Sequence, residues 1–126
     1  MSSPCWVTAA DACVDIKLGT GMAAYEPKTV VEVFKATVAK HGSRPAMQVK
    51  IPVDGKVPDD WKVWTWQQYW DDCIKFAKSL VFLNVNAFKV INIIGFNSPE
   101  WFIANCGAIV AGGIAAGIYT TNTAEA

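Results

Sequence analysis

A run without charged residues, from Trp101 to Tyr119, constrains most strongly what this chain can fold into. Its 19 residues come close to the length of a helix that crosses a lipid bilayer. Such a run also occurs in the buried core of an α/β domain, and its glycines are residues that phosphate-binding loops use. The residues within and around the run decide between these three structures.

Helix start and stop signals divide the run. Ser98 can accept a hydrogen bond from a free amide, Pro99 suits the first helical position, and Glu100 suits the positive end of a helix dipole. The adjacent Gly112 and Gly113 favour the end of a helix. The sequence therefore predicts a helix that begins at Pro99 and stops near the paired glycines.

Apolar strands flank this helix. Val90–Phe96 is a continuous apolar run with β-branched residues, which is typical of a buried parallel strand. Residues 114–119, IAAGIY, indicate a second short strand. Strand, helix and strand together are predicted to form a βαβ unit that is buried on both sides.

A membrane span is the alternative for the same residues. It would have to include Asn105 and four glycines, and its nearest basic flank is Lys89. Gly113 and Gly117 do form the G-x-x-x-G pattern found where membrane helices pair. The buried βαβ unit fits these residues better, while a small membrane protein stays open as an alternative.

A capped helix and a hairpin are predicted upstream. Thr29 can cap a helix with Glu32 as its reciprocal partner, which makes a capping box. Two strands follow, Ala46–Ile51 and Trp61–Thr65, and between them lies a polar loop with proline and Asp-Gly turn signals. Pairing these strands as an antiparallel hairpin is the simplest arrangement.

A second capping box, at Thr65 and Gln68, begins the next predicted helix, which ends next to Asn84. Asp71 and Lys75 are predicted to pair on the solvent face of this helix. Its buried stripe is predicted at Trp66, Trp70, Cys73, Ala77 and Leu80.

Composition excludes several kinds of site. Eleven basic residues balance eleven acidic ones and neither sign clusters, so no nucleic-acid partner is predicted. His41 is the only histidine, and the cysteines lack zinc-site spacing, so no metal ligands are assigned. Cys73 and Cys106 fall on apolar helical positions and are interpreted as core residues with reduced thiols. The four cysteines are Cys5, Cys13, Cys73 and Cys106.

Two further patterns imitate functional motifs. GTGMAA, at Gly19–Ala24, matches the dinucleotide pattern G-x-G-x-x-G/A, which works only between a strand and a helix. Pro27 interrupts any helix after it, so a loop is the interpretation. His41 closes a predicted helix and has no serine or cysteine motif as partner, which favours a structural role.

Two stretches resemble one enzyme family. WTWQQYWDDCIKFAKSL, at residues 64–80, and VINIIGFNSPEWFIANCGAIVAGGIAAGIYTTN, at residues 90–122, are similar to the N-terminal part of bubblegum-type acyl-CoA synthetases. These are long-chain fatty-acid–CoA ligases of the adenylate-forming, AMP-binding superfamily. The resemblance covers most of residues 27–123. It implies an α/β fold, the partial N-terminal lobe of an adenylate-forming enzyme. Residues 1–28 would be an irregular segment, and residues 29–126 a truncated N-terminal part of the AMP-binding domain.

The resemblance also implies an activity for the complete enzyme. ATP and a long-chain fatty acid would give an acyl-adenylate and pyrophosphate, with magnesium at the phosphates, and CoA would then displace AMP. The family's phosphate loop, ribose-binding acid and lysine have no match here, so no catalytic, cofactor-binding or metal residue is assigned. The chain alone is predicted to need no cofactor and to be inactive. Tyr119–Asn122 is a candidate edge of the acyl site, because ligands of open α/β folds lie beyond the carboxyl ends of strands.

Other roles stay open at this point. The chain could be a non-enzymatic interaction module or half of a split enzyme. A partial lobe leaves strand edges and apolar faces uncovered, which predicts self-association. No basic start followed by an apolar run begins the sequence, so no signal peptide is expected. A cytoplasmic location is predicted, with peripheral association with the endoplasmic reticulum membrane left open.

Overall fold

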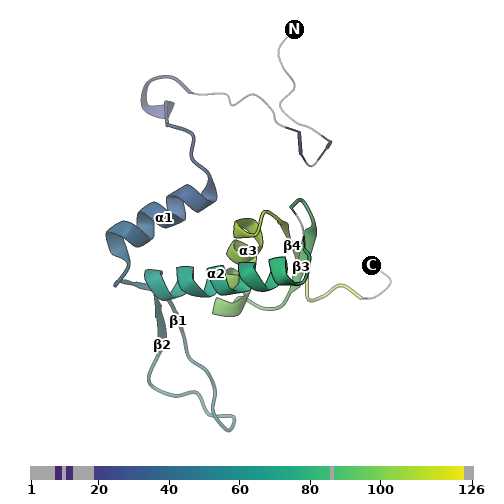
Figure 1. Cartoon of the computed structure of the whole chain (residues 1–126). Helices are drawn as coiled ribbons and strands as arrows, with labels where there is room; N and C mark the ends of the chain where they lie inside the picture. The colour runs from purple at the N-terminus through teal and green to yellow at the C-terminus, as the bar shows by residue number, and fades with distance from the viewer. Residues whose placement is uncertain (1–7, 10, 13–18, 86, 124–126) are drawn as a thin grey trace.

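The computed structural model describes residues 8–9, 11–12, 19–85 and 87–123. Cys5 and Cys13 lie outside the described residues, as does much of segment 1–28. In that segment, η1 (Gly21–Ala23) is a single 3-10 turn, followed by irregular chain up to the first α-helix (Figure 1). No helix follows GTGMAA directly, as the loop interpretation predicted.

Helix α1 (Val30–His41) begins with the predicted capping box. The Thr29 hydroxyl accepts from the Glu32 amide at 3.1 Å, and the Glu32 carboxylate accepts from the Thr29 amide at 2.7 Å. These bonds satisfy amides that a helix start leaves free. The helix ends at His41, as predicted, and its one buried side chain is Phe34.

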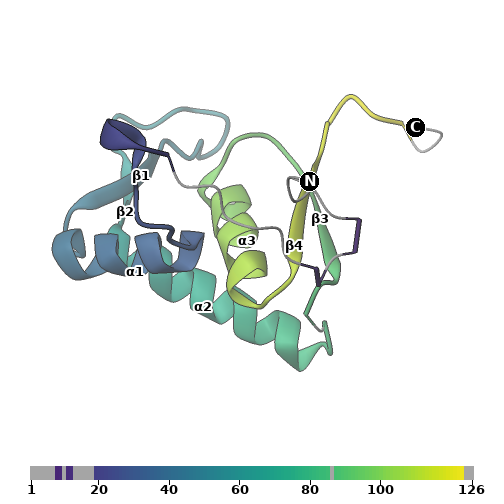
Figure 2. The same cartoon turned by 90° about the horizontal axis from the view of Figure 1, so that it is seen from above.

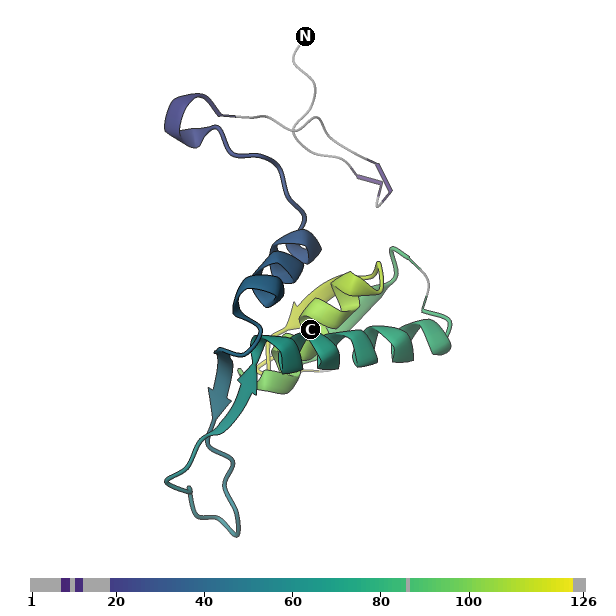
Figure 3. The same cartoon turned by 60° about the vertical axis from the view of Figure 1, so that its left-hand side comes forward.

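A hairpin connects α1 to the next helix. Strand β1 (Pro45–Val49) pairs antiparallel with β2 (Lys62–Thr65), which confirms the predicted hairpin with slightly shorter strands. The loop between the strands projects away from the helices (Figure 3). The carbonyls of Gly42 and Arg44 accept from the first two amides of the following helix, at 3.0 Å each. The hairpin base is therefore tied to that helix start.

Helix α2 (Trp66–Phe82) is capped by Thr65 and Gln68 as predicted, and Asn84 after it has the expected left-handed φ of 58°. The predicted stripe is largely right. Trp66 and Trp70, however, are half-buried rather than buried. The helix residues that are buried are Tyr69, Cys73, Ala77 and Leu80.

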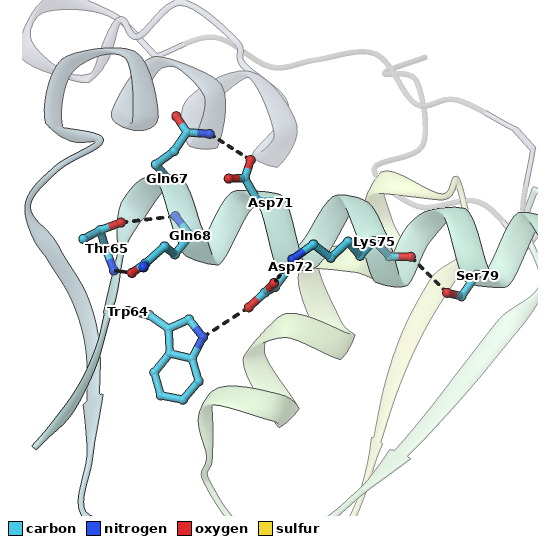
Figure 4. A network of polar contacts seen from close by, with 8 residues as sticks. All are labelled: Trp64, Thr65, Gln67, Gln68, Asp71, Asp72, Lys75 and Ser79. Carbon is cyan, nitrogen blue, oxygen red and sulfur yellow. Dashed lines mark hydrogen bonds and ion pairs between the residues drawn. The ribbon is translucent and has the colours of Figure 1, made fainter.

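The predicted ion pair between Asp71 and Lys75 is wrong. Lys75 Nζ lies 2.9 Å from Asp72 Oδ1, whereas Asp71 accepts from the side-chain amide of Gln67 at 2.9 Å (Figure 4). Asp72 also accepts from the Trp64 indole at 3.2 Å. The lysine hydrogen bond, followed by the indole bond, holds the pKa of Asp72 below its usual value. The indole of Trp64 on β2 thus holds Asp72, and not Asp71, in position to pair with Lys75.

The second half of the described chain is the predicted βαβ unit. Strand β3 (Val90–Ile94) and β4 (Ile114–Ile118) pair in parallel, and α3 (Pro99–Val110) connects them. Gly112, with φ of 83°, makes the turn that a side chain would strain. Among the described residues, no helix is both long and apolar enough to cross a bilayer.

Helix α3 lies between α2 and the two parallel strands (Figure 2). The prediction that β3 is buried on both sides is wrong, because Val90 is 57% and Ile94 62% exposed. Within the described ranges the sheet has these two strands alone, and α3 covers one face of it. A strand needs neighbours and covering elements on both faces before an apolar sequence is fully buried.

Candidate functional site

A hollow of about 400 Å³ lies at the carboxyl ends of β3 and β4. In open α/β sheets this edge is where ligands bind, because the loops after parallel strands meet there. The hollow is lined by the turn after β3, one side chain of α3, and the end of β4. Its lining residues are Gly95, Phe96, Asn97, Trp101, Gly117, Ile118, Tyr119 and Thr120.

The Trp101 indole forms the inner wall of the hollow. A Cβ at Gly117 would lie 3.4 Å from Trp101 Cζ2, and a Cβ at Gly95 would lie 3.9 Å from Trp101 Cδ1. The ring therefore lies across both strand ends and packs against backbone. Phe102 meets the same ring edge-on, with centroids 5.7 Å apart, which holds the indole in place.

The turn before α3 fixes the position of Trp101. The Ser98 hydroxyl accepts from the Trp101 amide at 3.2 Å, so the predicted cap is present. Asn97 lines the hollow and also a second one of about 300 Å³, which lies between β1 and the start of α3. One short turn thus connects the hairpin to the candidate site.

The hollow is uncharged, and it combines apolar surface from Phe96, Trp101 and Ile118 with the polar side chains of Asn97 and Thr120. None of its lining residues carries a charge, and none is a cysteine or histidine. In the part of the chain that the structure describes, no three His, Cys, Asp or Glu residues form a group that could hold a metal. Phosphate needs converging amides and cations, and magnesium needs several oxygen donors. The residues of this hollow therefore do not fit ATP phosphates or magnesium, whereas they fit an apolar chain or an aromatic ring.

One lining residue of the hollow was singled out from the sequence. Tyr119, predicted at the edge of an acyl site, lines the hollow and is 81% exposed. A turn follows it, in which the Asn122 amide donates to the Tyr119 carbonyl at 3.1 Å. The contact between Trp101 and Gly117 was not predicted from the sequence. A large aromatic residue one turn into a helix after a parallel strand is the signal that could have found it.

The fold and the hollow define the class: an α/β lobe with an uncharged hollow at the carboxyl ends of its parallel strands. The family model of the AMP-binding enzyme matches residues 34–126, which is most of the chain. The chain therefore belongs to the AMP-binding enzyme family.

Curated relatives narrow the comparison. The chain is 44% identical to the long-chain-fatty-acid–CoA ligase ACSBG2 of Gallus gallus, over 99% of this chain and 16% of that protein. It is 41% identical to the Homo sapiens ACSBG2, over 95% of this chain and 17% of that one. The Mus musculus ACSBG1 is 36% identical over 96% of this chain and 16% of its own length. The chain thus spans about a sixth of the relatives it matches.

Solved structures support the fold at lower identity. The N-terminal subdomain of Klebsiella oxytoca NpsA superposes with a TM-score of 0.65 at 16% identity, over 79% of this chain and 23% of that one. The fatty acid AMP ligase from Legionella pneumophila gives 0.61 at 15% identity, over 74% and 15%. The architecture is that of the N-terminal subdomain of adenylate-forming enzymes, as the sequence predicted.

Proposed function

We propose that this chain is the N-terminal part of a long-chain fatty-acid–CoA ligase and supplies a wall of its acyl site, not its catalytic groups. The identity of 36–44% to such ligases, spread over nearly the whole chain, carries the proposal. The uncharged hollow at the carboxyl ends of β3 and β4 supports the acyl part of it. In the complete enzyme, ATP would activate the fatty acid as an acyl-adenylate, and CoA would then form the thioester.

The role of the chain's own residues follows from burial. Trp101, Ile118 and Tyr119 present apolar surface to the hollow. Each methylene of an acyl chain that leaves water against such a surface gains about 0.8 kcal/mol. These residues would bind and orient the hydrocarbon, whereas ATP, magnesium and CoA would be held by residues outside this chain. We place the enzyme in the cytoplasm, and peripheral contact with the endoplasmic reticulum membrane stays an open alternative.

One experiment compares this chain alone with the same chain inside a ligase. Purified residues 1–126, given ATP, magnesium, CoA and a long-chain fatty acid, should form no acyl-CoA and no pyrophosphate. A chimera in which these residues replace the matching segment of the Gallus gallus relative should form acyl-CoA, measured by mass spectrometry. Turnover by the isolated chain, or a soluble chimera without activity, would contradict the proposal.

The acyl wall is tested in that chimera. Tyr119→Ala should enlarge the hollow and shift the preferred acyl chain length, seen as a changed ratio of kcat/KM between two fatty acids. Val57→Ala is the matched control, because Val57 is an exposed residue of the hairpin loop, outside the lining of the hollow. An equal loss for both fatty acids in the Tyr119 variant would show that the residue does not contact the acyl chain.

A second candidate function is half of a split enzyme. Phe82 is 85% and Phe96 82% exposed, which is the surface expected of a lobe that packs against a partner polypeptide. Coexpression with the rest of the Gallus gallus relative, as a separate chain, distinguishes the two. Activity without a covalent link would favour the split enzyme, and binding without activity would favour a non-enzymatic interaction module.

A further inference from the structure

Two thiols and a phenol meet where α2 crosses α3. The helices are close there, because a Cβ at Gly107 would lie 2.9 Å from the Cys73 carbonyl oxygen. The neighbouring Cys106 directs its thiol at α2, with Sγ 3.0 Å from the Tyr69 hydroxyl oxygen. Cys106 packs against the buried cluster that contains Cys73 and Tyr69, and the interaction of the two thiols shifts the pKa of both. The acyl hollow contains none of these residues.

The two thiols differ in access. Cys73 is fully buried, with 0% of its surface exposed. Cys106 is half-buried and lines an open groove of about 390 Å³ between α1 and the other two helices. A small molecule can therefore reach Cys106 but not Cys73. The groove residues around it are Val30, Val33, Phe34, Trp66 and Tyr69.

The two thiols also differ in acidity. Hydrogen bonds from Cys73 and then Tyr69 favour the thiolate of Cys106 and lower its pKa, although burial opposes this. The same hydrogen bond with Cys106, together with burial, raises the pKa of Cys73. Burial raises the pKa of Tyr69, so its hydroxyl keeps the proton it donates. Lys28 is the other titratable group that lines the groove.

The Tyr69 proton has two acceptors within reach, the Phe102 carbonyl at 3.2 Å and the Cys106 sulfur at 3.0 Å. A charged acceptor forms the stronger hydrogen bond, so ionisation of Cys106 directs the proton toward sulfur. The arrangement is therefore an accessible nucleophilic sulfur with a protonated, buried sulfur behind it. Redox-sensitive cysteine pairs have this division of roles.

We propose that Cys106 is a peroxide-reactive thiol and that Cys73 resolves it, giving a reversible disulfide that joins α2 to α3. The Cys106 thiolate attacks one oxygen of a hydroperoxide, the O–O bond breaks, and the departing alkoxide takes up a proton as an alcohol. Cys106 is then a sulfenic acid. The Cys73 sulfur attacks it and displaces hydroxide, which leaves with the Cys73 proton as water. Two thiols and one hydroperoxide thus give one disulfide, one alcohol and one water. This inference does not depend on the proposed ligase function.

The test uses the full 126-residue chain with Cys5→Ser and Cys13→Ser, so that only the two described thiols remain. Treatment with tert-butyl hydroperoxide should remove both thiols and produce one tryptic species that links the Cys73 and Cys106 peptides within a single chain. Dithiothreitol should reverse it. Linkage found only between chains would overturn the proposal. So would a peroxide-treated chain in which N-ethylmaleimide still reacts with both thiols.

Single variants assign the roles. Cys73→Ser should accumulate a sulfenic acid at Cys106, trapped by dimedone, because no resolving thiol remains. Cys106→Ser should leave Cys73 unlabelled at the same peroxide concentration. If dimedone labels Cys73 in the Cys106→Ser variant as fast as it labels Cys106 in the Cys73→Ser variant, Cys106 is not the preferred peroxide-reactive thiol and the proposal is overturned.

A separate test measures whether the Tyr69 hydroxyl lowers the pKa of Cys106. A purely structural role of Tyr69 would leave the pH profile of alkylation unchanged. Cys73 is kept for this test, because it is fully buried and helps to lower the pKa of Cys106. Alkylation of Cys106 by iodoacetamide should reach its half-maximal rate well below about pH 8.5, the usual pKa of a free cysteine. Tyr69→Phe keeps the ring and removes the donor. It should raise the midpoint of the pH profile by about one unit, since one hydrogen bond to a charged group is worth about one pKa unit, and slow alkylation by up to about tenfold at pH values below that midpoint. An unchanged pH profile would show that Tyr69 does not activate the thiol.

Discussion

At the scale of single residues, Gly107 controls how closely α2 and α3 approach. Its added Cβ would lie 2.8 Å from Phe76 Cδ1 and 2.9 Å from the Cys73 carbonyl oxygen. The phenylalanine ring can move, but a backbone oxygen inside α2 can move only with its helix. We expect Gly107→Ala to lower the free energy of unfolding, because overpacking costs about 1–3 kcal/mol and the helix gains only about 1 kcal/mol from alanine. Urea unfolding followed by far-ultraviolet circular dichroism measures the change.

Gly95 provides the matched control for this prediction. Its added Cβ would lie 3.9 Å from Trp101 Cδ1, which is an ordinary contact. Gly95→Ala should therefore change the free energy of unfolding by no more than about 0.5 kcal/mol. If both variants unfold at the same urea concentration, the close approach at Gly107 does not limit packing.

Single residues also show what the sequence could predict of the candidate site. The Ser98 cap depends on residues three apart in the chain, so local rules found it. The contact of Trp101 with Gly117 depends on how α3 packs over two strands. Residue spacing along the chain does not predict this packing. The G-x-x-x-G pattern of Gly113 and Gly117 does not mark a helix here, because Gly113 precedes β4 and Gly117 lies within it.

At the scale of elements, the capping boxes set where the helices begin. The Thr65 hydroxyl accepts from the Gln68 amide at 3.2 Å, and the Gln68 side chain accepts from the Thr65 amide at 2.9 Å. Thr65→Ala removes the first bond and should destabilise the chain by about 1 kcal/mol. The measurement is the same urea unfolding curve.

Thr37→Ala tests whether this loss belongs to the cap. Thr37 lies inside α1, where its hydroxyl donates to the Val33 carbonyl at 2.8 Å. Alanine is the better helix former at such a position, so this variant should be neutral or slightly more stable. Equal destabilisation by both threonine variants would mean that the loss comes from side-chain packing and not from capping.

Elements were predictable from the sequence to within a few residues, because caps, turns and apolar periodicity are local signals. Burial was not. The apolar run of β3 predicted two covered faces, whereas the strand has one neighbour and one covering helix. Tyr69 was left out of the predicted stripe of α2, yet it is buried, since α1 and α3 approach α2 from two sides. The number of neighbouring elements is a property of the assembled chain.

At the scale of the whole molecule, apolar side chains remain uncovered around the parallel strands. Phe82 and Leu83 end α2, Val90 and Ile94 lie on β3, and Phe96 follows it, all of them exposed. Monomeric proteins rarely expose a continuous apolar patch of several such residues. A two-stranded sheet also leaves strand edges unpaired, and such edges pair with other chains.

We therefore expect the isolated chain to self-associate through this surface. Light scattering should show particles larger than a monomer, and a dye that fluoresces on apolar surfaces should bind. Phe82→Lys with Ile94→Lys should reduce both signals, because each charge opposes burial of the patch. Met22→Lys is the control: Met22 is as exposed as these residues but belongs to η1, far along the chain from the strands. A monodisperse monomer with a sharp thermal transition and little dye binding would instead identify an autonomous module, whose exposed phenylalanines need no partner to remain soluble.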